Sequence, residues 1–182
     1  MIILNIFEYS RIIIIGNNGS GKSFLAKELS AITGLPIVHL DVEFWRPNWE
    51  KPTKEKWIMK QNELMSNKKW IIDGNHTGTM ELRFKSADLI IFLDINRLVC
   101  LLGVFRRYGK KRSDMPQHLE ERFDLEFFKF LRGLWTFNKT RKHTILELQE
   151  KYSHKPFFTL RSRAEVNNLL NQLREKKVDK LL

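Results

Sequence analysis

Residues 16–23 read Gly-Asn-Asn-Gly-Ser-Gly-Lys-Ser, which matches the spacing G-x-x-x-x-G-K-[ST] of a phosphate-binding loop (P-loop). Glycines let backbone amides approach an anion closely. The lysine of such a loop bridges the β- and γ-phosphates, and the following hydroxyl binds Mg²⁺. We therefore predict that the phosphates of ATP are bound by Gly16, Asn17, Asn18, Gly19, Ser20, Gly21, Lys22, Ser23 and Phe24. Within this set, Lys22 is the predicted catalytic group and Ser23 the predicted magnesium ligand.

A magnesium ion at such a loop usually needs a further carboxylate nearby. Asp73, which ends the apolar run 70–72, is the favoured candidate. Asp41 and Asp94 compete with it, because they also follow apolar runs. In open α/β sheets, ligands bind at the carboxyl ends of the strands. We therefore expect at least one of these three acids to be functional.

The elements that position these residues alternate between short apolar runs and helical patterns. We predict strands over residues 11–15, 36–40, 69–72, 88–93 and 157–160. We predict helices over residues 22–32, 53–66, 97–108, 119–137, 141–152 and 163–174, the last begun by a capping box at Ser162 and Glu165. This alternation is typical of an α/β domain with a parallel sheet, here one domain over residues 1–182.

The chain has a formal charge of +11, and the excess is unevenly placed. Residues 1–96 hold 12 basic and 11 acidic side chains, whereas residues 97–182 hold 20 and 10. The asymmetry predicts an anionic partner, which could be a nucleic acid, a membrane surface or a phosphorylated small molecule. The five histidines have no metal-ligand spacing, which argues against a transition-metal site.

Cysteine content and the N-terminal residues bear on the compartment. The lone Cys100 lies among apolar residues, so we expect a buried, reduced thiol. Asn5, Glu8 and Arg11 interrupt the apolar start of the chain, which excludes a membrane span there and argues against a signal peptide. We expect a cytoplasmic protein with no membrane partner.

Several ordered motifs together resemble the P-loop nucleotide-kinase-like family of DNA topology modulation proteins (FlaR-related), itself similar to adenylate and shikimate kinases. The motifs occupy residues 16–23, 39–41, 44–49, 70–75, 82–83, 87–94, 121–124 and 160–163. The resemblance implies a three-layer α/β/α fold with a five-stranded parallel sheet, a helical acceptor-side insertion near residues 43–67 and a lid near residues 106–120. Residues 1–9 lie before the first of these motifs. They are either an extra strand or an extension that results from the choice of an upstream start codon.

The resemblance also implies roles for single residues. Asp73, followed by Gly74, looks like the magnesium-side acid of nucleotide kinases, and Arg161 and Arg163 match the segment beside the adenine. Asp41 and Glu43 resemble the acidic pair with which shikimate-type kinases orient or deprotonate a hydroxyl. Phe24 departs from the family pattern, which has a small hydroxyl residue there.

Arginines near the implied lid supply the positive charge that phosphoryl transfer needs. Arg107 and Arg122 lie at either end of the lid, and together with Lys22 and Asp41 they form the predicted catalytic set. Arg46, Asn75 and Arg83 are expected to hold polar or anionic groups of the acceptor.

Two functions compete at this stage. The favoured one is a small-molecule or nucleotide kinase that uses ATP and Mg²⁺. The alternative is an ATP-binding regulatory or DNA-associated protein without kinase turnover. Only the positive charge and the family resemblance support a role with DNA, because the sequence has no recognised nucleic-acid-binding motif. A bound triphosphate would neutralise part of the basic excess, so the charge needs no nucleic acid to explain it.

Overall fold

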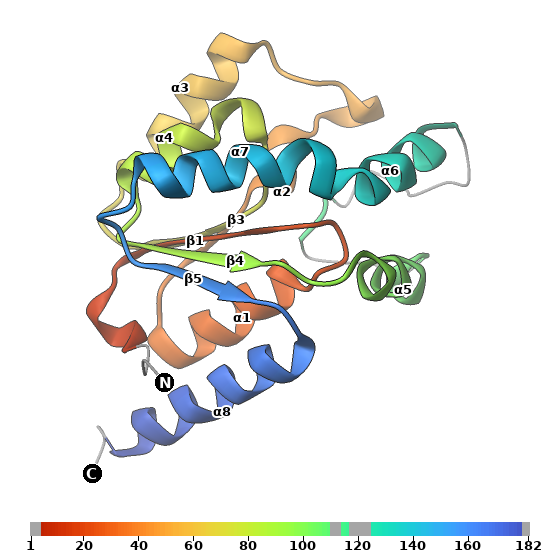
Figure 1. Cartoon of the computed structure of the whole chain (residues 1–182). Coiled ribbons are helices and arrows are strands. Elements are labelled where there is room, and N and C mark those ends of the chain that lie inside the picture. The colour runs from red at the N-terminus through yellow and green to blue at the C-terminus, as the bar shows by residue number, and fades with distance from the viewer. Residues whose placement is uncertain (1–4, 110–113, 117–124, 180–182) are drawn as a thin grey trace.

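The computed structural model describes residues 5–109, 114–116 and 125–179. Its centre is a parallel sheet of five strands in the order β2-β3-β1-β4-β5 (Figure 1). The strands are β1 (Arg11–Gly16), β2 (Ile37–His39), β3 (Trp70–Asp73), β4 (Leu89–Leu93) and β5 (Phe157–Leu160). All five predicted strands are therefore confirmed, with small differences at their ends.

Strand β1 shows why the sheet is covered on both faces. Its β-branched residues are fully buried, and alternate side chains enter different cores, because successive residues of a strand point to opposite faces. Ile12 and Ile14 belong to one core, and Ile13 and Ile15 belong to the other. Two buried faces require two helical layers, and the predicted three-layer α/β/α fold is confirmed.

The helices divide between these two faces (Figure 1). Helices α1 (Lys22–Thr33), α5 (Arg97–Arg107) and α8 (Arg163–Asp179) contribute to the core that contains Ile12. Helices α3 (Lys54–Met65), α4 (Met80–Ser86) and α7 (Phe137–Lys151) contribute to the other core. The remaining elements are α2 (Leu40–Phe44), α6 (Leu125–Trp135), and the 3₁₀ turns η1 (Ile6–Glu8), η2 (Pro47–Trp49) and η3 (Thr77–Thr79).

The predicted capping box at the start of α8 is confirmed. The Glu165 amide donates to Ser162 Oγ at 3.1 Å, and the Glu165 carboxylate accepts from the Arg161 amide at 2.9 Å. Helix α8 then continues beyond the predicted end at residue 174, because Arg174 pairs with Glu28 of α1 and Lys177 Nζ donates to the Ala31 carbonyl at 2.8 Å.

Other predictions need correction. Helix α7 begins at Phe137, not at residue 141, because Phe137 is buried in the second core. The predicted helix over 119–137 is described only from Leu125, where α6 begins. Helices α2 and α4 were not predicted. The described part of residues 1–9 holds η1 rather than an extra strand, and its Ile6 is fully buried in the core.

No helix in the described part of the chain is long and apolar enough to cross a membrane.

Candidate active site

The P-loop joins β1 to the N-terminus of α1. Gly19 and Gly21 have φ angles of 77° and 100°, a region that favours glycine. A Cβ at Gly19 would lie 2.1 Å from the Cys100 carbonyl oxygen, so only glycine fits against α5. The loop leads directly into the first turn of α1, whose amides have no partner within the helix. Such a helix start binds anions well.

Two asparagines hold the loop in this shape. The Asn75 side chain, from the segment after β3, accepts from the Gly16 amide at 3.1 Å and donates to the Gly16 carbonyl at 2.7 Å. Asn17 is buried, and its Nδ2 donates to the Leu134 carbonyl at 3.0 Å while its Oδ1 accepts from the Asn18 amide at 2.8 Å. The Asn17 side chain therefore connects the loop to α6 by a hydrogen bond. Because the side chain is engaged in this way, only the backbone of Asn17 can contact a phosphate.

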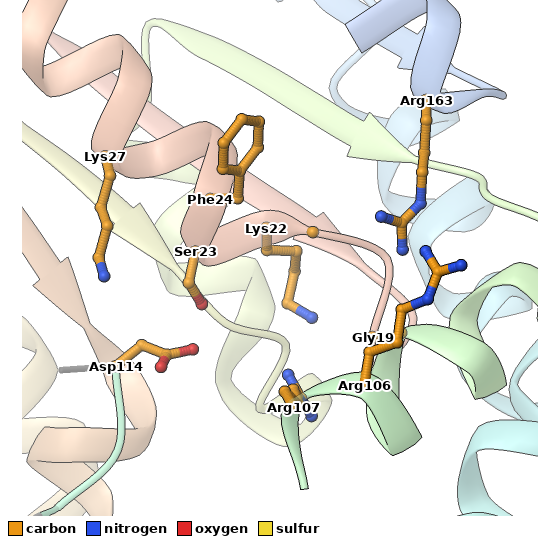
Figure 2. A pocket seen from close by; sticks show the side chains of 11 residues that line it. Gly19, Lys22, Ser23, Phe24, Lys27, Arg106, Arg107, Asp114 and Arg163 are labelled. Atoms are coloured by element: carbon orange, nitrogen blue, oxygen red, sulfur yellow. The ribbon is translucent and has the colours of Figure 1, made fainter. Parts of the chain in front are cut away.

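A cavity of about 390 Å³ opens beside the P-loop, and we call it the P-loop cavity (Figure 2). Lys22, Ser23 and Phe24 line it from the start of α1, and the Phe24 side chain is 52% exposed. Arginines line it from two other helices, namely Arg106 and Arg107 of α5 and Arg163 of α8. In Figure 2 the side chains of Arg106 and Arg163 point toward one another. The cavity thus combines free amides with a concentration of positive charge.

Lys22 is the central cation of this site. Its Nζ donates to the Asn17 carbonyl at 3.0 Å, so the side chain lies along its own loop. Burial lowers the pKa of Lys22, and Arg107 acts in the same direction, whereas Asp73 and Asp41 oppose the shift. An anion bound in the P-loop cavity would raise the pKa of Lys22, which favours the charged ammonium, and would take the place of the carbonyl.

A second, larger cavity of about 860 Å³ adjoins the first, and we call it the wide cavity. Residues 41–51, the segment 73–77 and the helices α6 and α7 contribute to its walls. Lys22, Ser23, Arg107 and Asp114 line both cavities. A molecule in the wide cavity would therefore meet a molecule in the P-loop cavity beside these four residues.

The three strand-end carboxylates have different surroundings. Asp73 is buried, lines the wide cavity and accepts from His39 Nδ1 at 2.6 Å. Asp41 lines the wide cavity and pairs with His76 Nε2 at 3.1 Å. Asp94 pairs with Lys142 Nζ at 2.7 Å and lines neither cavity. The structure thus brings Asp41 and Asp73 to the site and leaves Asp94 outside it.

Asp41 is held as a carboxylate. Burial acts to raise its pKa, but the hydrogen bond with His76 and the charges of His76 and Lys22 outweigh burial and lower the pKa below its ordinary value. The side chain is nevertheless 56% exposed, and the exposed part faces the wide cavity. Asp41 can therefore accept a proton from a group bound there.

Several predicted acceptor residues lie elsewhere. Arg83 is fully buried and lines neither cavity, because α4 places it on the same inward face as Met80 and Phe84. Its guanidinium donates to Gln61 Oε1 and to the Asn75 carbonyl. Arg83 thus supports Asn75 instead of contacting an acceptor. Glu43 pairs with Lys60 at 3.5 Å, and neither Glu43 nor Arg46 lines the P-loop cavity or the wide cavity.

The arginines predicted beside the adenine separate as well. Both are exposed, but Arg163 lines the P-loop cavity and Arg161 lines neither cavity. Arg122 and most of the predicted lid, residues 110–113 and 117–120, lie outside the described residues.

The fold itself is found in known kinases. The chain is similar to a shikimate kinase from Acinetobacter baumannii in complex with shikimate, with 16% identity, a TM-score of 0.60 and 97% of each chain covered. It is also similar to a gluconokinase from Sinorhizobium meliloti 1021, with 14% identity, a TM-score of 0.54 and coverage of 94% of this chain and 95% of that one. The protein has a P-loop kinase fold. No model of a known family matches the sequence, and no curated protein matches it.

At this level of identity the likeness concerns the fold of these P-loop kinases and not their substrates. It extends over nearly the whole chain, which includes the P-loop and the carboxyl ends of the strands. The similarity to DNA topology modulation proteins rests on the sequence motifs alone.

Sequence reasoning missed some residues of the site. His76 is not among the predicted site residues, although it directly follows the motif at residues 70–75. Gln61 lies on the buried face of α3, where a polar residue signals a buried hydrogen bond. The wide cavity also includes Lys51 and Arg141, for which the sequence has no local signal.

Proposed function

We propose that the protein is a kinase that transfers the γ-phosphoryl group of ATP to a hydroxyl group of a small molecule. The observation that supports this most strongly is the shared boundary of the two cavities, which is formed by Lys22, Ser23, Arg107 and Asp114. A P-loop that only bound a nucleotide would need no second cavity at the position of the γ-phosphate. Phosphoryl transfer depends on such positioning and on positive charge around the transferred group.

The proposed donor is ATP in the P-loop cavity, with its phosphates on the loop amides and Lys22. Arg163, and Phe24 on the opposite side, would flank the base. Ser23 and Asp73 line the wide cavity and offer the hydroxyl and carboxylate oxygens that Mg²⁺ prefers, so these residues fit a magnesium ion. When bound, Mg²⁺ neutralises part of the phosphate charge.

The proposed acceptor site is the wide cavity, with Asp41 as the general base. The acceptor oxygen would form a bond to the γ-phosphorus while the bond from that phosphorus to the bridging oxygen of ADP breaks. The hydroxyl proton would pass to the Asp41 carboxylate. Lys22 and Arg107 would stabilise the charge that spreads over the transferred group. Arg122 and a closing lid at residues 106–120 remain part of this proposal.

The described basic residues of the second half fit this function. Arg106, Arg107 and Arg163 converge on one concave site, which favours a compact polyphosphate. The DNA-associated alternative has no comparable observation in its favour.

Titration of the protein with ATP and Mg²⁺ tests the donor site. We expect saturable binding in the wild type, loss of binding in Lys22→Ala and unchanged binding in Lys56→Ala, a control at an exposed lysine of α3. Equal binding by the wild type and Lys22→Ala would exclude the proposed donor site.

A coupled assay of ADP release over a panel of hydroxyl compounds tests the transfer step. At least one compound should raise ADP release well above the rate with water alone. If ATP binds but no compound does so, the kinase proposal is wrong and an ATP-binding regulator becomes the better reading.

A further inference from the structure

The wall of the wide cavity formed by residues 44–51 is aromatic. Trp45 and Trp49 line it with their ring centroids 5.4 Å apart and their planes at 74°, and Phe44 packs edge-on against Trp45 at 4.9 Å. Trp49 is 42% exposed and is one of the large apolar side chains that lie at the surface of the described structure. This wall presents flat apolar surface to whatever fills the cavity.

The backbone of Trp49 adds an independent sign of function. Its φ is 59°, a conformation that bulky residues rarely adopt. Backbone strain of this kind occurs mainly where a side chain must be held at a binding site. Here the strain is combined with a partly exposed ring in an edge-to-face arrangement with Trp45.

Four carboxylates line the wide cavity, those of Asp41, Asp73, Asp114 and Glu126, and the ion pairs described for them do not involve Lys51 or Arg141. Glu126 pairs with Lys129, Asp41 with His76 and Asp73 with His39. Lys51 lies 5.6 Å from the centre of the Trp45 ring. Within residues 5–109, 114–116 and 125–179, no carboxylate forms an ion pair with Lys51 or Arg141. These two cations on the cavity wall are available to an anionic group.

We propose that the acceptor is a planar ring compound that carries an anionic group, a phosphate or a carboxylate, in addition to the hydroxyl that is phosphorylated. The ring would pack on Trp45 and Trp49, and the anionic group would contact Arg141 and Lys51. The hydroxyl lies toward Asp41, because an anionic group there would be repelled by the carboxylate. This inference rests on the proposed kinase function, from which it takes the role of the wide cavity.

A set of four probes separates the two requirements. Uridine 5′-monophosphate has a ring and an anion, uridine has only the ring, ribose 5-phosphate has only the anion, and ribose has neither. Binding is measured by calorimetry while a non-hydrolysable ATP analogue and Mg²⁺ fill the P-loop cavity. A second pair of probes, 4-(hydroxymethyl)benzoate and benzyl alcohol, tests whether a carboxylate on the ring strengthens binding.

We expect the probe with both groups to bind about tenfold or more tightly than the probe that lacks either one. Arg141→Gln should weaken binding of the monophosphate about tenfold and leave uridine unchanged. Trp49→Ala should weaken both by a similar factor. Arg132→Gln and Trp135→Ala are the matched controls, because both residues are exposed on α6 and line neither cavity.

Several results would overturn the inference. They are equal binding of all four probes, no binding of any probe in either set, or displacement of the monophosphate by the ATP analogue, which would place it in the P-loop cavity. Failure of the kinase proposal is a separate outcome: the probes would bind with the expected preference, and ADP release would stay at the rate with water alone.

Discussion

The side-chain amide of Asn75 bonds both backbone polar atoms of Gly16, at 3.1 and 2.7 Å. Gly16 is the last residue of β1 and the first of the P-loop. Asn75 is held in turn by Arg83, which donates to its carbonyl and to Gln61 of α3. A chain of hydrogen bonds therefore runs from Gln61 of α3 to the loop proposed to bind ATP.

Asn75→Ala should weaken ATP binding and lower the stability of the protein. The substitution leaves the buried amide and carbonyl of Gly16 without partners, which costs about 2–4 kcal/mol of unfolding free energy. The loop loses its fixed position, so we expect the dissociation constant of ATP to rise about tenfold. Denaturant unfolding and ATP titration measure the two effects. Asn62→Ala, on the exposed face of α3, is the control, and an ATP affinity equal to that of the wild type would show that Asn75 does not position the loop.

Arg83 gives a prediction about the same network. Burial lowers its pKa to about 9, which reflects the cost of an interior charge, although the guanidinium stays protonated at neutral pH. Arg83→Lys keeps the charge but cannot reach both acceptors, so we expect a loss of about 2–4 kcal/mol. Arg83→Met removes the buried charge together with the hydrogen bonds and should cost less. Thermal or denaturant unfolding gives the order, and a lysine variant more stable than the methionine variant would contradict it.

Gly103 and Gly133 are two helical glycines at which the same substitution by alanine should have opposite effects. A Cβ at Gly103 of α5 would lie 2.5 Å from the Gly19 carbonyl oxygen, whereas a Cβ at Gly133 of α6 would meet nothing closer than 3.8 Å. Gly103→Ala must push the P-loop away, so we expect ATP binding to weaken about tenfold and stability to fall about 1–3 kcal/mol. Gly133→Ala should stabilise the protein by about 0.5–1 kcal/mol and leave ATP binding unchanged. If both alanines raised stability, α5 and the loop would not be in the contact described.

Arg161 and Arg163 are both exposed arginines, but only Arg163 lines one of the two cavities, so their variants show how much the place of the charge matters. Arg163→Ala removes a cation from the wall of the P-loop cavity, and we expect the ATP dissociation constant to rise about tenfold. Arg161→Ala should change it less than about twofold, because an exposed charge outside the cavity contributes little. Titrations at two salt concentrations test this. Equal effects of both substitutions would mean that overall charge, and not the cavity, attracts the nucleotide.

The sequence predicts those features that depend on neighbouring residues. Strand β1 can be predicted because a continuous β-branched run is typical of a strand that is buried on both faces. The P-loop can be predicted because its glycines must occur at a fixed spacing. The short helix α4 lacks such a local signal. Without that helix, the spacing of Met80, Arg83 and Phe84 could not place Arg83 on a buried face.

Contacts between distant segments could not be predicted in this way. Asn75 and Gly16 lie 59 positions apart and meet only because β3 pairs directly with β1. The pairing of Asp41 with His76 likewise depends on β2 and β3 being neighbours. The sequence could identify the carboxylates at the strand ends, but only the strand order decides which partner each one meets.

The pair of Asp41 and His76 predicts how the reaction depends on pH. As the proposed general base, Asp41 must be ionised, and Asp41→Asn should lower kcat about 10²–10⁴-fold with little change in ATP binding. His76 and Lys22 lower the pKa of Asp41, whereas burial and the charge of Asp114 raise it. The wild type should therefore keep its kcat at pH values below the ordinary range of an aspartate.

In His76→Ala, Lys22 remains as the main group that lowers the pKa of Asp41, while burial and Asp114 still act to raise it. The pKa of Asp41 therefore rises, and the acid limb of the kcat profile moves to higher pH. The profile above this limb should keep the wild-type shape. His143→Ala, at an exposed histidine of α7 that pairs with Glu147, is the control and should leave the limb in place. A limb that stays unchanged in His76→Ala while kcat falls at every pH would mean that His76 orients the acceptor or the loop, and that it does not set the charge of Asp41.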